Sequence, residues 1–519
     1  MQRTSSYNIG LLFHKIANEF QNKTAIQELT GSQYSYQQLD TLSSAIANHL
    51  LSCGAEKNQV VCIFHEKTIH AYASMLACLK LGLIYCNLDY TCPIDRLNRI
   101  IKTCTPRFFL AGPNTLPITN TITFSLNTKI INYSSIGIGT EPIRHPLKQM
   151  HQVTGADPAY IMFTSGSTGF PKGALIAHAS IINFAKWANE KIGITSSDAL
   201  TNLNPMHFDN SVFDFYASLL NNATLIPIAD SLLKQPKKLI KALSNIYCST
   251  WFSVPSLLIY ILSLRALEDG DLPSLKRIIF GGEGFPKNKL RELSSKLCKH
   301  VDLINVYGPT ECTCICSAYY ANNEDLESPG LLPLGFIADN FSYLILNNDN
   351  SVCKPFEKGE LCLLGPNVGL GYYNNTTMTS ASFKQNPLNH NYPEIMYCTG
   401  DFVYYDNAKN ALFFSGRKDN QIKRMGYRIE LEEIDIAIGS LPYVSECITI
   451  YQAGDQSRGQ IISFISAENN DEISLLNDLR NLLPSYMIPD ALRYLVHLPK
   501  NKNGKIDRQS LVNLIEKAS

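Results

Sequence analysis

Apolar and polar residues alternate with two different periods along most of the chain. Residues 36–53 carry apolar side chains at the spacing of an amphipathic helix, and residues 69–81 continue with a second helical segment. Short apolar runs at 60–64 and 108–111 are typical of buried strands. Helices that alternate with buried strands predict layered α/β sheets, in which parallel strands are covered by helices.

This rhythm is interrupted twice. Residues 113–149 are rich in Thr, Asn, Ser and Pro, which predicts an irregular connection with one short strand near Ile130. The alternation resumes from 159 to about 317. Between 331 and 405, short strands separated by Gly, Pro and Asn predict a small antiparallel or barrel-like module. From residue 420 the chain returns to a mixture of helices and strands.

Composition excludes several classes of protein. The 519 residues include 45 Lys and Arg against 45 Asp and Glu, so the net charge of +0 argues against a dedicated nucleic-acid binder. With 45% hydrophobic residues the chain is globular rather than disordered. No secretory signal and no run of about 18 apolar residues is evident, so we expect a cytoplasmic protein without a membrane span.

The 15 cysteines are scattered among apolar positions, such as Cys62 and Cys86, and predict reduced core thiols rather than disulfides. Cys312, Cys314 and Cys316 alternate, which would place them on one face of a strand. The paired CxxC spacing of a structural zinc site is missing there, so we expect no metal at these three residues.

The strongest candidate for chemistry is the segment TSGSTGFPKG at 164–173. It follows the apolar run 159–163, and its glycines let backbone N–H groups approach an anion while Ser, Thr and Lys add hydroxyls and charge. Pro171 occupies a position where a Walker A motif requires glycine. The segment therefore predicts a phosphate-binding loop of another type. A bland Gly/Ser linker is the weaker alternative.

This loop resembles the signature of the adenylate-forming superfamily, which includes acyl-CoA synthetases, firefly luciferase and the adenylation domains of nonribosomal peptide synthetases. Further segments resemble the superfamily's other motifs, in the same order and over nearly the whole chain. They are LKLGLIYCNLD at 79–89, FDNS at 208–211, NVYGPTE at 305–311, GELCLLGPNVGLGY at 359–372, YCTGD at 397–401, GRKDNQIKRMGYRIELEEID at 416–435, LPSYMIP at 483–489 and NGKIDR at 503–508. The last two resemble the amino-acid-activating branch, and the layout resembles that of stand-alone D-alanine carrier protein ligases.

The resemblance implies a catalytic lysine and an ATP site. Adenylation joins a carboxylate to the α-phosphate of ATP, so cations and N–H donors must offset the repulsion between two anions. Lys505 would bridge carboxylate and phosphate in the transition state, although a lysine in a polar loop is otherwise a solvated surface charge. The expected ATP-binding residues are Thr164, Ser165, Gly166, Thr168, Lys172, Asn305, Tyr307, Gly308, Thr310, Asp401 and Arg417.

Glu311 is the expected Mg²⁺ ligand, because a carboxylate beside phosphates needs an intervening cation. A surface or helix-capping glutamate is the alternative. Tyr307 would stack on adenine unless it is simply a core aromatic. Asp401 would hold both ribose hydroxyls, reinforced by Arg417.

Asp209 indicates the class of substrate. An acid in an acyl pocket needs a cationic partner, and the α-ammonium of an amino acid supplies one, unless Asp209 only caps a helix. By resemblance the pocket is further lined by Asn210, Phe213, Ser253, Ile279, Gly281, Val306, Cys314 and Ile315. None of these eight is charged, which favours a neutral side chain. D-alanine ligases usually have cysteine at the position of Gly281, which weakens D-alanine as the substrate.

The family's hinge corresponds to Asp419, with an ordinary Asx turn as the alternative. We therefore expect an α/β core over 1–418, with layered sheets and the barrel-like module, and a mobile α+β lid over 419–519. Only eleven residues follow Arg508, so we expect the carrier to be a separate molecule.

The expected reaction is ATP-dependent and Mg²⁺-dependent activation of a neutral amino acid as aminoacyl-AMP, followed by transfer to the phosphopantetheine thiol of a separate carrier protein. An acyl-CoA synthetase that uses free coenzyme A is one alternative. A catalytically silent protein that binds ATP or an amino acid is the other.

Overall fold

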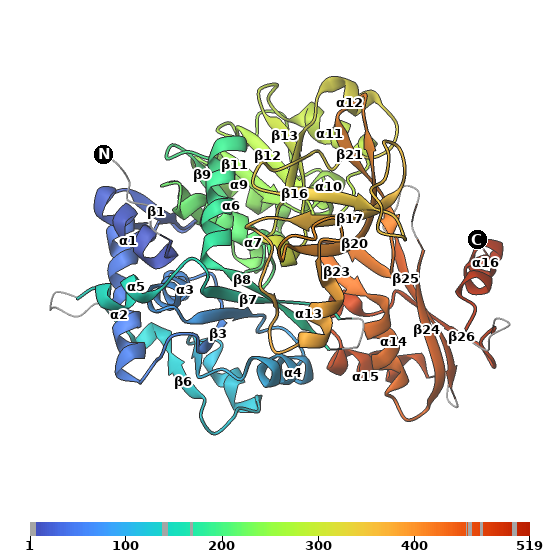
Figure 1. Ribbon diagram of the computed structural model, residues 1–519, viewed down its shortest axis with the longest axis horizontal. Helices are drawn as coiled ribbons and strands as arrows, with labels where there is room; N and C mark the ends of the chain where they lie inside the picture. Colours follow the sequence, from blue (N-terminus) through green and yellow to red (C-terminus); the bar gives the residue numbers. More distant parts are fainter. Residues whose placement is uncertain are drawn as a thin grey trace. The chain divides into compact units, whose positions relative to one another are not determined.

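The computed structural model describes residues 7–137, 144–166, 170–452, 454, 459–467, 471–500 and 506–518 (Figure 1). The chain divides into two compact units. The first comprises Met1–Tyr90, Thr103–Phe163 and Gly173–Lys418, and the second comprises Thr91–Lys102, Thr164–Lys172 and Asp419–Ser519. Two short stretches that precede Asp419 in the chain, one of them most of the phosphate loop, thus belong to the second unit.

The first unit contains a sheet with the strand order β15-β14-β13-β12-β11-β9-β10-β1-β2 among the described residues. Strands β13, β12, β11, β9, β10 and β1 run parallel, so their carboxyl ends lie along one edge, where ligands bind in open α/β sheets. The strands are β1 (Thr24–Gln27), β2 (Gln33–Ser35), β9 (Ala199–Asn202), β10 (Thr224–Pro227), β11 (Thr250–Ser253), β12 (Arg277–Gly281), β13 (Asp302–Tyr307), β14 (Ser317–Tyr320) and β15 (Phe336–Ile337).

A second sheet has the order β18-β8-β7-β4-β3-β5-β6, with parallel pairing from β7 through β6. Its strands are β3 (Val60–Phe64), β4 (Ile84–Leu88), β5 (Phe108–Ala111), β6 (Lys129–Asn132), β7 (Pro158–Thr164), β8 (Lys172–Ala177) and β18 (Gly371–Tyr372). The buried strands predicted at 60–64 and 108–111 and the short strand near Ile130 are confirmed. Every residue of β3, β4 and β5 is buried, which explains why these strands are continuous apolar runs.

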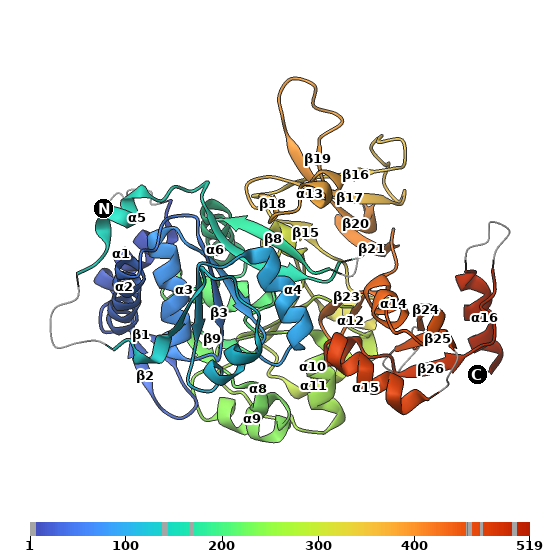
Figure 2. The ribbon, with the colours of Figure 1, turned by 90° about the horizontal axis from the view of Figure 1, so that it is seen from below.

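Local signals fix the helices at the N-terminal end of the first unit. Ser35 and Gln38 form a capping box at the start of α2 (Tyr36–Ser52), and Gly82 ends α3 (Ile69–Leu81) in the left-handed conformation. These two predicted helices are confirmed, and they pack against each other and against α1 (Ile9–Glu19), as Figures 1 and 2 show.

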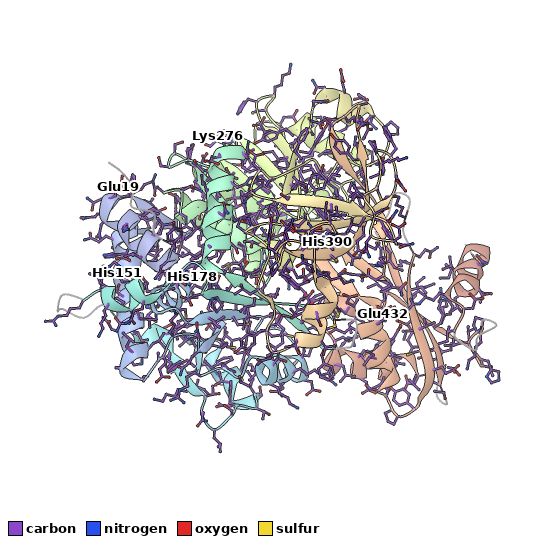
Figure 3. All side chains as sticks on the ribbon, in the orientation of Figure 1. Glu19, His151, His178, Lys276, His390 and Glu432 are labelled. Atoms are coloured by element: carbon purple, nitrogen blue, oxygen red, sulfur yellow. The ribbon has the colours of Figure 1, made fainter. Side chains whose placement is uncertain are left out.

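The other helical segments of the first unit are distributed among the strands. In Figure 3, the labelled His178 marks the start of α6, where its imidazole accepts a hydrogen bond from the backbone N–H of Ile9. The segments are η1 (Leu116–Thr121), η2 (Tyr133–Ser135), α5 (Leu147–Gln152), α6 (His178–Lys191), α7 (Asn210–Val212), η3 (Phe213–Ala217), α8 (Asp230–Leu233), α9 (Pro236–Ser244), α10 (Pro255–Ser263), α11 (Lys287–Lys296), η4 (Thr310–Cys312), α12 (Asn323–Glu327) and α13 (Thr376–Ser382).

The small antiparallel module predicted between 331 and 405 is confirmed for β16, β17, β19 and β20, and β21 extends it to Arg417, whereas β15 and β18 in the same stretch pair with the two larger sheets. Strands β16, β17, β20 and β19 follow one another in an antiparallel sheet, and β21 pairs with β20. Their bounds are β16 (Ser342–Leu346), β17 (Gly359–Leu364), β19 (Phe383–Gln385), β20 (Ile395–Asp406) and β21 (Ala411–Arg417).

The second unit has its own apolar core of α+β character, in which α14 and α15 pack beside β25. A hairpin of β22 and β23 precedes a mixed sheet of the order β24-β25-β26. The elements are α4 (Ile94–Cys104, its last two residues in the first unit), β22 (Gln421–Arg424), β23 (Tyr427–Glu430), α14 (Leu431–Gly439), β24 (Val444–Gln452), β25 (Gln460–Ala467), α15 (Glu472–Leu482), η5 (Ser485–Met487), β26 (Ala491–Tyr494) and α16 (Arg508–Ala518).

All fifteen cysteines are free thiols, as predicted, but only ten of them are buried core thiols, since Cys298 is exposed and Cys53, Cys353, Cys398 and Cys447 are partly exposed. The expectation that Cys312, Cys314 and Cys316 share one face of a strand is wrong. Cys312 ends the 3₁₀ turn η4, Cys314 has a φ of 74°, and β14 begins only after Cys316. Alternate spacing cannot place side chains on one face where the backbone is not extended. Within the described part of the chain, no helix combines the length and apolarity needed to cross a bilayer.

Candidate functional site

The carboxyl end of β13 brings three of the predicted ATP-binding residues together. Tyr307 is the last residue of β13, and its hydroxyl donates a 2.6 Å hydrogen bond to Oδ2 of Asp401. Arg417, which pairs in register with Asp401 across β20 and β21, donates to the other carboxylate oxygen at 2.5 Å. Both Tyr307 and Asp401 are buried, and burial together with the Asp401 charge raises the pKa of Tyr307. The Asp401 carboxylate is therefore buried and accepts hydrogen bonds from two side chains. It lies at the end of the site where we expect the nucleoside of ATP to bind.

The next turn connects this group to the expected amino-acid site. Thr310 begins η4, and its hydroxyl donates a 2.6 Å hydrogen bond to Oδ2 of Asp209, which precedes α7. Asp209 makes no side-chain capping hydrogen bond to α7, so the capping alternative is not supported. The two residues are 101 positions apart in the chain.

Glu311, the predicted Mg²⁺ ligand, is fully buried at 0% exposure. The hydroxyl of Tyr372 on β18 donates to its Oε1 at 2.7 Å. A surface glutamate is therefore excluded. A buried carboxylate oxygen is the kind of ligand that Mg²⁺ prefers, so this residue fits the predicted role.

Several predicted pocket residues share one face of the large sheet. Ile279 and Gly281 alternate on β12, and Gly281 pairs with Val306 on β13, so all three lie on the same face. A Cβ atom at Gly281 would lie 2.3 Å from the carbonyl oxygen of Val306, so glycine is required at this close approach. Apolar pocket residues from other segments join the same hydrophobic cluster, namely Phe213, Cys314 and Ile315.

Ser253 does not lie with them. It pairs with Phe280, on the opposite face of the sheet, and its hydroxyl accepts a 2.8 Å hydrogen bond from the indole of Trp251. Its neighbour Phe252 pairs with Ile279 and so lies on the pocket face. The motif resemblance missed Phe252 because a shift of one residue along a strand changes the face. Only the register with β12 could have identified it.

Phe252 also contacts a predicted pocket residue directly. Its ring lies edge-on to that of Phe213, with centroids 5.1 Å apart and planes at 73°. Both side chains are almost completely buried. Phe252 is therefore a stronger candidate than Ser253 for the wall of the pocket.

The backbone after η4 is strained. Thr313 and Cys314 have φ values of 61° and 74°, which are costly for residues with a Cβ, and above all for a β-branched threonine. The Thr313 hydroxyl donates to the carbonyl of Asn367 at 2.8 Å and helps to hold this conformation. A Cβ at Gly308 would lie 2.1 Å from the carbonyl oxygen of Cys314, so the turn also needs glycine there.

Two further predicted site residues, Asn305 and Asn210, also lie in the first unit. Asn305 donates from its side-chain amide to the carbonyl of Pro333 at 2.7 Å. Asn210 begins α7 and is partly exposed.

Sequence reasoning also missed Asp214, which directly follows Phe213 and is fully buried. Its Oδ2 accepts hydrogen bonds from the side-chain amides of Asn202 at 2.9 Å and Asn204 at 3.0 Å, while no partner of Oδ1 is found in the described part of the chain. Burial raises the pKa of Asp214 to about 7. An acid in an apolar run gave no sequence signal, because its partners come from another segment.

The phosphate loop belongs to the second unit, where its groups contact the segment 428–433. The Ser165 hydroxyl donates to a backbone carbonyl at 2.7 Å, the N–H of Gly166 donates to Glu433 at 3.4 Å, and the Lys172 ammonium lies 3.6 Å from Glu430. The hydroxyl of Thr164 is buried, and no hydrogen-bond partner for it is found among the described residues. The predicted residues Thr168 and Lys505 lie outside the described residues.

Asp419, the predicted hinge, is the first residue of the C-terminal segment of the second unit. It is exposed, and its Oδ1 accepts a 3.3 Å hydrogen bond from the N–H of Gln421. This contact is an Asx turn, so the turn is present whether or not the residue also serves as a hinge.

Comparison with known proteins agrees with the fold. The family described as AMP-binding enzyme matches residues 13–373. The chain is 30% identical over 493 residues to a protein of Bacillus cereus (strain Q1) named D-alanine--D-alanyl carrier protein ligase, covering 93% of this chain and 94% of that protein. The chain therefore belongs to the AMP-binding enzyme family, and it is an ATP-using, AMP-forming ligase.

Solved structures share the fold. One is NpsA-ThdA, an artificially fused adenylation-PCP di-domain NRPS from Klebsiella oxytoca, with a TM-score of 0.80 at 19% identity over 98% of this chain and 97% of that chain. Another is the amide bond synthetase McbA from Marinactinospora thermotolerans, with a TM-score of 0.82 at 18% identity over 97% of this chain and 99% of that chain. At these identities the likeness concerns the fold alone.

Proposed function

We propose that the chain activates a neutral amino acid with ATP as an aminoacyl-AMP and passes the aminoacyl group to the phosphopantetheine thiol of a separate carrier protein. The 2.6 Å contact between Thr310 and Asp209 carries this proposal. An α-phosphate bound at Thr310 and an α-ammonium bound at Asp209 would be neighbours. Attack of a carboxylate on phosphorus requires this proximity of the two substrates.

The nucleoside end is assigned to Tyr307, Asp401 and Arg417. A carboxylate offers two oxygens and can accept from both ribose hydroxyls, and the hydrogen bond from Arg417 holds the Asp401 carboxylate in position. The ring of Tyr307, whose hydroxyl is held by Asp401, is proposed to stack on adenine. Asn305 and Gly308 are proposed to border this site.

The substrate carboxylate and the phosphates of ATP repel each other, and we propose that three cationic groups offset this repulsion. Mg²⁺, held by Glu311, would neutralise charge on the phosphates when bound. Lys172 and the other loop residues would bind the departing phosphates, and Lys505 would bridge carboxylate and α-phosphate as charge develops. A turn of residues 419–519 about Asp419 would then admit the thiol of the carrier.

The apolar cluster around Ile279, Val306 and Cys314 supports a neutral side chain, because burial of a charged group among apolar residues costs free energy. The relatives' printed name supports a carrier protein as acceptor. The relatives' printed name also includes D-alanine as the amino acid. D-alanine ligases usually have cysteine at the position of Gly281, where this chain has no space for a side chain, so D-alanine is tested directly here. Fifteen free thiols support a reducing compartment, and we place the protein in the cytoplasm, within nonribosomal peptide synthesis or a similar carrier-dependent route.

ATP-pyrophosphate exchange over the proteinogenic amino acids and D-alanine tests this function. We expect exchange with one or a few neutral amino acids, and none with the corresponding des-amino acids. Turnover of fatty acids with free coenzyme A would instead establish an acyl-CoA synthetase. Binding of ATP without exchange for any acid would establish a silent binding protein.

A further inference from the structure

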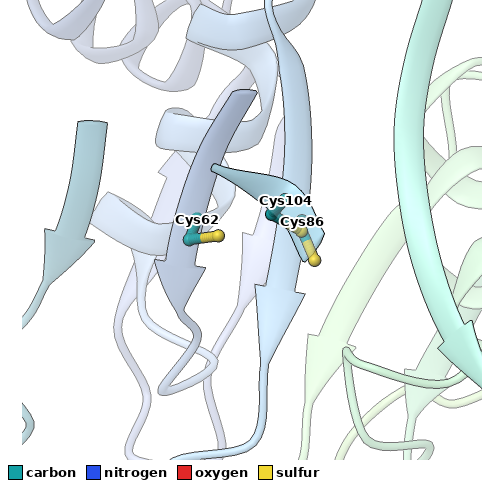
Figure 4. A group of neighbouring side chains, drawn as sticks. All are labelled: Cys62, Cys86 and Cys104. Atoms are coloured by element: carbon teal, nitrogen blue, oxygen red, sulfur yellow. The ribbon is translucent and has the colours of Figure 1, made fainter. Parts of the chain in front are cut away.

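Three cysteines that the proposed reaction does not use converge in the first unit. Cys62 lies on β3 and Cys86 is its register partner on the neighbouring parallel strand β4, while Cys104 is the last residue of α4. Their sulfur atoms all lie within 4.8 Å of one another, and the three residues have 0% exposure. Figure 4 shows the Cys62 side chain directed toward the other two. The group is therefore a buried set of three thiols drawn from three separate elements.

The spacing suits a single metal ion. Metal–thiolate bonds are about 2.3 Å long, so three sulfurs around one ion in a plane are roughly 4 Å apart. Sulfur atoms within 4.8 Å of one another would need to move by less than about 1 Å to reach that geometry, which is within the range of small χ1 adjustments.

The number and type of ligands select the ion. In the described part of the chain the group has three members and no fourth His, Cys, Asp or Glu joins it, whereas structural zinc takes four ligands. Soft thiolates favour Cu(I).

We infer that Cys62, Cys86 and Cys104 form a three-coordinate site for a soft monovalent cation, Cu(I). Binding forms three Cu–S bonds and releases the three thiol protons to solvent, because the thiolate is the form that ligates a metal, with no change of oxidation state. The inference is independent of the adenylation chemistry, because none of the residues assigned to ATP or amino acid takes part.

A second group of possible metal ligands is less suited to a metal ion, because a buried positive charge lies beside it. His14, Asp40 and His145 also place donor atoms within 4.8 Å of one another. The ammonium of Lys80, fully buried, already lies 2.7 Å from Asp40. A metal ion there would meet a buried positive charge, so we assign no site to it.

The test is anaerobic titration of the reduced full-length chain with Cu(I) delivered from a coloured bicinchoninate complex. We expect the wild type to bind one equivalent more tightly than the Cys62→Ser and Cys104→Ser variants do. The loss of affinity should exceed the roughly 10- to 100-fold typical of losing an outer-shell partner. Cys248→Ala, which removes a buried thiol from a different cluster, is the matched control and should keep the wild-type affinity.

Copper X-ray absorption provides the second measurement and should report three sulfur neighbours in the wild type. Circular dichroism and urea unfolding of the copper-free variants separate loss of the site from loss of the fold. Equal affinity in all variants, equal loss in Cys248→Ala, or fewer than three sulfur neighbours would each overturn the inference and leave the three cysteines as core thiols.

Discussion

The opposite faces of Phe252 and Ser253 give a sharp test of the pocket. We expect Phe252→Leu to change the preference of the enzyme among neutral amino acids and Ser253→Ala to leave it unchanged. Phe252 lies on the face of Ile279 and touches Phe213, while Ser253 accepts from Trp251 on the other face. Neighbouring residues of one strand should therefore behave differently.

The expected magnitudes follow from these contacts. Ser253→Ala leaves the buried indole N–H of Trp251 without its acceptor, which should lower the free energy of unfolding by about 1–3 kcal/mol. Phe252→Leu loses the edge-on contact with Phe213, worth about 0.5–1.5 kcal/mol. Because one methylene in an apolar pocket is worth about 1–3 kcal/mol, the selectivity between two amino acids that differ in size should change by roughly 10-fold or more in Phe252→Leu.

The assay is ATP-pyrophosphate exchange with the preferred amino acid and a neutral analogue larger or smaller by one methylene. The quantity compared is the ratio of the two kcat/KM values, since this ratio cancels differences in the active fraction of each preparation. Urea unfolding measures stability in parallel. A changed ratio in Ser253→Ala with no change in Phe252→Leu would refute the assignment of Phe252, rather than Ser253, to the wall of the pocket.

Four further predictions follow from the contacts and the proposed roles. Lys505→Ala should slow exchange by about 10²-fold or more while ATP affinity measured by calorimetry is preserved, and normal exchange would contradict its proposed role. Asp209→Asn should raise the KM for the amino acid by roughly 10- to 100-fold through loss of a charged hydrogen bond, with the KM for ATP as the internal control. Because the pKa of Asp214 is raised by folding to about 7, the folded state binds the proton more tightly, so this residue should make the free energy of unfolding fall as the pH rises from about 4 to about 7. In urea unfolding of Asp214→Asn, the change of the free energy of unfolding with pH over that range should be more positive than in the wild type, and an identical slope would contradict this. Lys80→Met should cost about 3–5 kcal/mol in urea unfolding because it leaves the Asp40 carboxylate buried without its ammonium, and the double variant with Asp40→Leu should recover part of that loss.

Much of the fold could be predicted from local patterns. The segments 36–53, 60–64, 69–81 and 108–111 were predicted correctly because periodicity and burial agree there. The antiparallel module was predictable from its regularly spaced turn residues. Sequence periodicity gave no strand order, since pairing between strands far apart in the chain depends on packing rather than on local preference.

In the candidate site, too, local sequence identified some residues, while contacts between distant segments appeared only in the structure. Tyr307, Thr310 and Glu311 were identified by one contiguous motif, because a single strand and turn position them. The contacts of Tyr307 with Asp401 and of Thr310 with Asp209 join segments about 100 residues apart, so no local signal could reveal them.

The sequence by itself determined the family motifs, the neutral charge and the alternation of buried strands with amphipathic helices, since each depends on residues close together in the chain. Tertiary structure alone decided that Phe252 rather than Ser253 shares the face of Ile279, because side chains alternate along a strand and only register with β12 fixes which face is which. It likewise brought Cys62, Cys86 and Cys104 together, while a 3₁₀ turn and a left-handed backbone keep the regularly spaced Cys312, Cys314 and Cys316 from sharing one face of a strand. Spacing along the chain specifies proximity only where the backbone conformation is regular, and packing specifies it everywhere else.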